Sequence, residues 1–306
     1  MASVPLFALL TYYMHLVRSF DWVGLAFTPF FITRNSVLII GAGLVVASNS
    51  PATAAVIAVV AFVSCLVSVG SQALIFRVRL PAEIRRTVPD YRTREWVKVS
   101  FPLFLVGSSF LIIANTDILM LGGYVKPDDV GIYNAAVRTS GILNFVVIAG
   151  TARASPRYSA LHAQGKHDAL RALVSAVIRW VFWPSVFLAI LLIFFGDFVL
   201  SLFGPTFIAG YWPLLVLVAS NLVTASAGGV VHLLSMTGHQ KISAVVMACS
   251  ALVNIVLNAL LIPRFGLMGA AVATTVSYTV NTVWLVWIAR RRLGLHAFII
   301  PFGRVK

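Results

Sequence analysis

The chain has 306 residues, of which 60% are hydrophobic and only 10% are charged, and its mean hydropathy is +0.96. A soluble domain typically spends about a quarter of its residues on charge. This composition therefore excludes a disordered tail, a secreted disulfide scaffold and a cytosolic nucleic-acid binder, and it places the chain in a lipid bilayer. The two cysteines, Cys65 and Cys249, lie within apolar stretches and are expected to be small core residues.

Nine stretches are long and apolar enough, or nearly so, to cross ~30 Å of hydrocarbon as helices of roughly 20 residues. The second stretch carries Pro29 and Arg34 near its start, so we expect that helix to begin at the interface and to kink at the proline. The sequence thus predicts an all-α polytopic membrane protein with about nine transmembrane helices. In chain order they are 2–17, 28–49, 52–76, 99–121, 130–152, 172–195, 211–235, 242–262 and 267–289.

The Lys and Arg residues are concentrated in alternate connections between these stretches. Nineteen of them lie in one set of connections and two, Lys126 and Arg264, lie in the other. Because cytoplasmic loops of membrane proteins are enriched in Lys and Arg, the sequence predicts an outward N-terminus and a cytoplasmic C-terminus. The net charge of +14 is then explained by topology and by attraction to anionic headgroups, and no nucleic-acid partner is expected. The basic connections are 18–34, 77–98, 153–171, 236–241 and 290–306.

The beginning of the chain does not resemble a signal peptide. Met1–Leu16 has no basic n-region, and no small-residue cleavage site follows it. An outward N-terminus with nothing polar ahead of it is unusual for a complete membrane protein. We therefore expect the chain to be a fragment or to have a start codon assigned too late.

Two sequence blocks resemble a known family. The first block reads Asn115-Thr-Asp117-Ile-Leu-Met-Leu-Gly-Gly123 and continues as Val130-Gly-Ile-Tyr-Asn134-Ala-Ala-Val-Arg138. The second reads Asn254-x3-Asn258-x3-Ile262-Pro263-Arg-Phe-Gly266-x2-Gly269-Ala-Ala271-x-Ala273-Thr274. Both are similar to the flippases of polyprenyl-linked oligosaccharides, in the multidrug/oligosaccharidyl-lipid/polysaccharide exporter superfamily.

The resemblance implies the organisation of the chain, because members of this superfamily are built as two six-helix halves. Residues 1–76 are then the last three spans of the first half, and 77–98 is a basic cytoplasmic connection. Residues 99–290 form a complete second half, and 291–306 form a cytoplasmic tail.

The resemblance also implies a function. We expect a flippase that moves polyprenyl-pyrophosphate-linked oligosaccharide by alternating access, for polysaccharide, lipopolysaccharide or O-antigen synthesis in a bacterial cytoplasmic (inner) membrane. Its partners would be the lipid-linked oligosaccharide, membrane lipids, and the polymerase and glycosyltransferases of the same pathway. No cofactor and no metal are expected.

Ionisable side chains within the spans are candidate functional residues, since burying a charge in the bilayer costs several kcal/mol. Asp117 and Arg138 lie in neighbouring spans at a depth that we expect to be comparable, so they form an ion pair or face the substrate or a coupling ion. Asn134 shares a helical face with Arg138 and extends this candidate cavity. Arg179 either contributes to the cavity or extends back to the headgroups.

Polar residues also recur at helical spacing in the last three spans. They either line a hydrated interior that binds sugar hydroxyls or form hydrogen bonds between packed helices. For the coupling ion, Asp117 could carry a proton or a sodium ion, and His232 could titrate near neutral pH. The candidate cavity residues in these spans are Asn254, Asn258, Thr274 and Asn281.

Three other functions remain as alternatives. The first is a cation-coupled multidrug antiporter of the same superfamily, which is disfavoured because Asp117 is the only acidic residue placed within a span. The second is a membrane-embedded glycosyltransferase or polymerase, which is disfavoured because the outer loops are short and no ATP-binding phosphate loop or zinc-protease motif is present. The third is a fragment that is incompetent for transport by itself.

Overall fold

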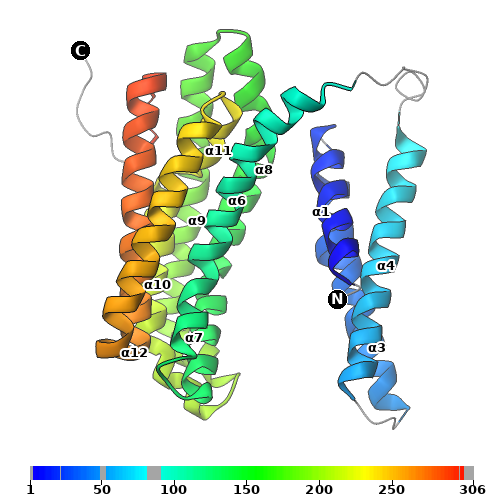
Figure 1. The fold of residues 1–306 in the computed structure, drawn as a ribbon, viewed down its shortest axis with the longest axis vertical. Coiled ribbons are helices and arrows are strands. Elements are labelled where there is room, and N and C mark those ends of the chain that lie inside the picture. Colours follow the sequence, from blue (N-terminus) through cyan, green and yellow to red (C-terminus); the bar gives the residue numbers. More distant parts are fainter. Residues whose placement is uncertain (1–2, 21, 49–52, 81–90, 296, 300–306) are drawn as a thin grey trace. The chain divides into compact units, whose positions relative to one another are not determined.

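The computed structural model describes residues 3–20, 22–48, 53–80, 91–295 and 297–299, and every regular element in this part of the chain is helical (Figure 1). The prediction of an all-α polytopic membrane protein is confirmed. The chain divides into two compact units, Met1–Tyr91 and Arg92–Lys306. Several of the predicted cytoplasmic cations lie outside the described residues, namely Arg85, Arg86, Arg304 and Lys306.

The first unit consists of helices α1 (Ser3–Ser19), α2 (Val23–Phe27), α3 (Arg34–Ala47) and α4 (Ala54–Arg79), with a π-helical segment, η1 (Thr28–Thr33), between α2 and α3. The irregularity expected at Pro29 therefore takes the form of a widened turn, in which Arg34 N–H donates to the Pro29 carbonyl. A π-helical turn accommodates proline because the ring removes one backbone donor from the ordinary helix.

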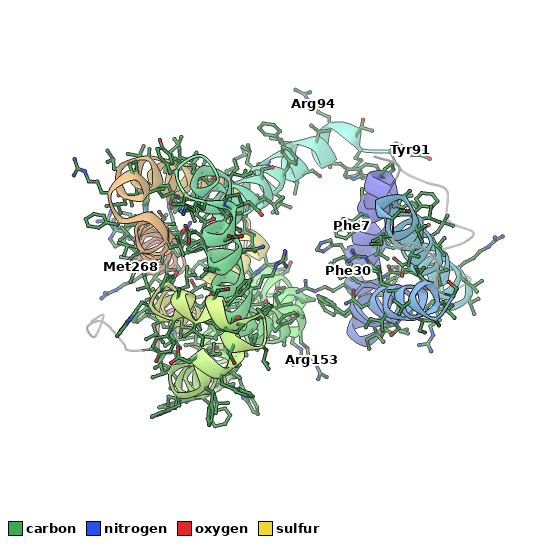
Figure 2. The ribbon with its side chains drawn as sticks, turned by 90° about the horizontal axis from the view of Figure 1, so that it is seen from below. Phe7, Phe30, Tyr91, Arg94, Arg153 and Met268 are labelled. Atoms are coloured by element: carbon green, nitrogen blue, oxygen red, sulfur yellow. The ribbon has the colours of Figure 1, made fainter. Side chains whose placement is uncertain are left out.

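Side chains join the helices of this first unit. Gln72 Nε2 of α4 donates to the Ala26 carbonyl of α2 at 3.1 Å. The rings of Phe7 and Phe30 (Figure 2) lie 5.6 Å apart. The Arg34 guanidinium lies 5.3 Å from the centre of the Phe7 ring. Arg34, expected in a polar connection, thus lies within the continuous helical segment Gly24–Ala47, where the aromatic ring stabilises its charge.

The second unit contains the remaining helices. They are α6 (Thr93–Leu121), α7 (Pro127–Ser140), α8 (Ile142–Ala163), α9 (His167–Ser201), η2 (Pro205–Gly210), α10 (Tyr211–Ser226), α11 (Val230–Met236) and α12 (Gln240–Leu293).

The 54-residue α12 is a helical hairpin rather than one straight helix. At Gly266 the backbone has φ +52° and ψ −128°, and the chain folds back there. Asn254 on the first leg donates to Thr274 on the second, and Asn281 on the second leg donates to Met247 on the first. The residue numbers of both pairs have the same sum, as an antiparallel register requires. The two legs correspond to the last two predicted spans.

Seven helical segments among the described residues are long and apolar enough to cross a membrane. The last of them is the α12 hairpin, and α1 has only 17 residues, so the count of nine spans stays a prediction.

The α9 helix shows which kind of side chain these segments expose on their surface. Its large apolar side chains form an exposed stripe at spacings of three and four residues, suited to hydrocarbon: Trp180, Trp183, Phe187, Ile190, Phe194 and Phe198.

Candidate functional site

A hydrogen-bonded carboxyl group lies inside the second unit. Asp117, near the end of α6, is 1% exposed. Its Oδ2 accepts a hydrogen bond from the Tyr133 hydroxyl of α7 at 2.6 Å and one from the Thr274 hydroxyl of α12 at 3.3 Å. Its Oδ1 accepts from the backbone N–H of Ile118 at 2.9 Å. Three helices therefore meet at one acidic side chain.

A chain of amides extends this site along the α12 hairpin. Asn254 Nδ2 donates to the Thr274 hydroxyl at 3.4 Å, and Asn258 Nδ2 donates to Asn254 Oδ1 at 3.1 Å. Both asparagines are fully buried, and Asn258 Oδ1 accepts no hydrogen bond from the described residues. We refer to Asp117, Tyr133, Thr274, Asn254 and Asn258 as the Asp117 cluster. Such a network is stable only when nearly all of its polar atoms are paired, because unpaired buried polar groups cost roughly 1–3 kcal/mol each.

The Asp117 cluster adjoins a small cavity of about 140 Å³. This volume is large enough for a few water molecules or a hydrated ion, but not for a saccharide. More than half of the residues that line it are polar. They are Asp117, Ser140, Asn144, Ser220, Asn221, Thr274 and Tyr278.

The expected pairing of Asp117 with Arg138 is wrong, because the two side chains do not lie at the same level. Asp117 lies four residues before the end of α6, whereas Arg138 lies eleven residues after the start of α7. At ~1.5 Å per residue, this places them roughly 10 Å apart along the helix axes. Tyr133, six residues into α7, reaches the carboxyl group instead. No ion pair joins Asp117 and Arg138 among the described residues.

The other predicted site residues lie outside the cluster. Arg138, Arg179 and His232 are exposed, and Asn134 is half-buried. Asn281 is buried and donates to the Met247 sulfur at 2.9 Å. In this conformation the two legs of α12 pack against each other, and the side-chain amides of Asn254, Asn258 and Asn281 all donate hydrogen bonds within the hairpin.

Sequence reasoning did not single out several residues of the site. Tyr133 belongs to the first of the two family-like blocks, but its residue type alone predicts no role. It lies six residues after the start of α7, close to the four residues that separate Asp117 from the end of α6, and this similar distance from the turn is the signal that could have indicated the contact. Asn144 and Ser140 flank Gly141, where α7 ends and α8 begins. The sequence does not show that isolated polar residues such as these line a cavity, because the lining depends on how the neighbouring helices pack.

Two family models match the chain. The model described as polysaccharide biosynthesis protein matches residues 1–162, and the MatE model matches residues 102–260.

Curated proteins give a consistent result. The chain is 26% identical over 172 residues to the probable low-salt glycan biosynthesis flippase Agl15 of Haloferax volcanii, and this match covers 55% of the chain and 36% of that protein. It is 27% identical over 181 residues to the probable flippase AglR of the same organism, covering 56% of the chain and 36% of that protein. The matched part is thus little more than a third of the length of each relative.

Solved structures show the fold. A crystal structure of a MATE point mutant has a TM-score of 0.75 and 14% identity, with 96% of this chain and 67% of that chain covered. A MATE structure in the bent conformation has a TM-score of 0.71 and 14% identity, with 89% and 62% covered.

Proposed function

Because the chain belongs to the polysaccharide biosynthesis protein family, within the multidrug/oligosaccharidyl-lipid/polysaccharide exporter superfamily, we propose that it serves in a flippase for polyprenyl-pyrophosphate-linked oligosaccharide. It is a multi-pass membrane protein. The family match carries the proposed class of substrate, and the names of the relatives Agl15 and AglR support it.

The physical task of such a protein is to move a charged, polar head group across hydrocarbon. A pyrophosphate and several sugars cannot cross unaided, because transferring an ion into a medium of low dielectric constant costs of order 20 kcal/mol. A passage between two helical units removes most of this cost when it opens to one side at a time and leaves the polyprenyl tail in lipid. Because the chain functions by binding and conformational change in this scheme, it is not an enzyme.

Arg138 is the residue that we propose to attract the pyrophosphate. It is exposed on α7, and no ion pair between it and an acidic side chain is present in the described part of the chain. A guanidinium group presents several donors and pairs with phosphate oxygens in a bidentate arrangement. Asn134 lies one helical turn earlier on the same helix and would bind the adjoining polar groups.

The Asp117 cluster is our proposed site for the coupling ion. It combines a buried carboxyl group and the hydroxyl of Thr274, which line a cavity large enough for a small cation. The unpaired Oδ1 of Asn258 lies farther along the same hydrogen-bonded network. Oxygen atoms of this kind bind hard cations or exchange a proton. Asn254 would position Thr274 by its hydrogen bond. His232 is exposed and is the weaker candidate for this role.

The membrane orientation of the protein and its partners are also part of the proposal. The distribution of Lys and Arg supports a cytoplasmic C-terminus. The relatives are archaeal, so a bacterial inner membrane, lipopolysaccharide and O-antigen find no support in them. We therefore restrict the proposal to a cell-surface glycan, and the polymerase and glycosyltransferases of its pathway remain proposed partners.

The test uses cells that lack their own flippase and accumulate lipid-linked oligosaccharide on the inner leaflet. Expression of the chain, or of a form extended at its N-terminus, is expected to restore transfer to the outer leaflet. Failure of both to do so would exclude the flippase. Export of cationic drugs without transfer of the oligosaccharide would instead establish the antiporter alternative.

A further inference from the structure

A groove of about 610 Å³ runs between α8 and α9 of the second unit, away from the Asp117 cluster. Its floor is made by small residues, among them Ala149, Gly150 and Ala176. A Cβ atom at Gly150 would overlap Val181 Cγ2, so the backbones of α8 and α9 approach closely below the groove. The groove is therefore a surface depression between two closely packed helices rather than an internal cavity.

One end of the groove is cationic. Arg153 and Arg157 line it from α8, one helical turn apart, and Arg153 projects from its helix in Figure 2. At ~1.5 Å per residue, Arg157 lies about 9 Å and Arg153 about 15 Å from the end of α8 at Ala163. Both arginines therefore lie in the half of α8 that leads to the connection 164–166, on the side where Lys and Arg are concentrated.

These two charges are not neutralised within the described residues. The salt bridges there join Arg92 to Glu95 and Arg171 to Asp168, and neither involves the groove. Arg153 and Arg157 are both exposed at its edge. Two adjacent cations without carboxylate partners favour an anionic ligand, and phosphate matches the planar fork of a guanidinium group.

The other end of the groove is apolar and continues onto the stripe of α9 that is suited to hydrocarbon. Trp180 forms its wall and is 77% exposed. It begins the stripe that continues through Trp183 and Phe187. Along the antiparallel helices, the groove thus changes from charged to apolar in the direction from the connection 164–166 toward the middle of the membrane.

We propose that this groove binds an acidic phospholipid of the cytoplasmic leaflet. The phosphate contacts Arg153 and Arg157, and one acyl chain lies over Ala149 and Ala176 against Trp180. A lipid matches both ends of the groove at once, whereas free phosphate leaves the apolar end uncovered. An acidic lipid is favoured over a zwitterionic one because no carboxylate among the described residues offsets the two cations. The groove is lined neither by Arg138 nor by any residue of the Asp117 cluster, so the lipid site and the proposed transport residues can be tested independently.

The test counts lipids bound to the purified full chain in detergent by native mass spectrometry, with phosphatidylglycerol and phosphatidylcholine as probes. We expect the unmodified chain to retain phosphatidylglycerol in preference. The double variant R153Q/R157Q is expected to lose one bound phosphatidylglycerol, with about a tenfold weaker apparent affinity. The control R171Q/R179Q removes two exposed arginines of α9 that do not line the groove, and it is expected to retain that lipid.

A steric variant keeps the proposal testable if the double variant does not fold. Ala149→Phe preserves both arginines and fills the apolar end of the groove from an exposed position, so it is also expected to lose the lipid. Equal losses in the control, equal retention of phosphatidylcholine, or full retention in Ala149→Phe would each overturn the proposal. Tighter binding of a polyprenyl phosphate than of phosphatidylglycerol would also overturn it, because the groove would then belong to the carrier lipid.

Discussion

The hydroxyl group of Tyr133 donates to Asp117 Oδ2 at 2.6 Å, and this bond joins α7 to α6 in the interior of the second unit. Both side chains are almost completely buried. The tyrosine occupies the position beside the carboxyl group at which a cation was expected. Asp117 is therefore held by neutral donors, and this arrangement supports our proposal that it exchanges a proton or a cation during a transport cycle.

Removing this bond is expected to destabilise the protein. Tyr133→Phe leaves the ring in place and deprives a buried carboxyl group of a donor, so we expect a loss of about 1–3 kcal/mol, seen as a lower Tm in detergent. The control is Tyr211→Phe, which removes a more exposed hydroxyl that donates to the Ile193 carbonyl at 2.8 Å. Equal decreases in Tm for the two variants would show that the hydrogen bond to Asp117 stabilises the protein no more than a more exposed hydrogen bond does.

Neutralising the carboxyl group is expected to uncouple transport. Asp117→Asn preserves size and can still accept hydrogen bonds, but it cannot bind a proton or a sodium ion as a carboxylate does. In vesicles with an imposed proton or sodium gradient, we expect gradient-driven transfer of the lipid-linked oligosaccharide to fall about tenfold or more. Asp197→Asn, at an exposed position on α9, is the matched control. Unchanged gradient dependence in Asp117→Asn would remove the coupling role.

Arg138 is expected to be needed for substrate binding. Charge-assisted hydrogen bonds are worth about 1.5–3 kcal/mol, so Arg138→Ala is expected to reduce transfer about tenfold to a hundredfold while membrane insertion is unchanged. Arg179→Ala, at another exposed arginine of the second unit, is expected to retain transfer. Full activity of Arg138→Ala in the flippase-deficient cells would exclude this arginine from the mechanism.

The close approach of α8 and α9 is expected to be sensitive to one methyl group. Because a Cβ at Gly150 overlaps Val181, Gly150→Ala is expected to cost about 1–3 kcal/mol and to lower the Tm. Gly107→Ala, in α6 with nothing within 4 Å, is expected to be neutral or slightly stabilising, since alanine favours helix. Adding Val181→Ala to Gly150→Ala should restore part of the loss, and no recovery would contradict the steric explanation.

The fold of the α12 hairpin is expected to depend on glycine at one position. Gly266 has a backbone conformation that other residues rarely adopt, and an added Cβ would only touch Val125 at 4.0 Å. The cost of Gly266→Ala therefore comes from the backbone and is expected to be about 1–3 kcal/mol. The control is Gly70→Ala, which adds the same methyl group in α4, where open space surrounds it. The measurement is the Tm of each variant. Equal Tm values for the two variants would contradict this account.

The sequence by itself determined the properties that depend on local composition. The lengths of the apolar stretches predicted the membrane environment and the all-helical fold. The sequence blocks around Asp117 and Asn254 indicated the family. Asp117 could be selected as a candidate site residue because burying an acidic side chain at bilayer depth is costly whichever way it points.

Tertiary structure decided which side chains meet. Whether Asp117 contacts Arg138 or Tyr133 depends on how far α6 and α7 are displaced relative to each other along their axes. This displacement cannot be read from the sequence of either helix alone. The burial of Asn254 and Asn258 likewise follows from the fold of α12 at Gly266, which packs two polar stripes against each other. Helix rotation and offset are set by contacts such as that of Gly150 with Val181, and these involve residues distant in the chain.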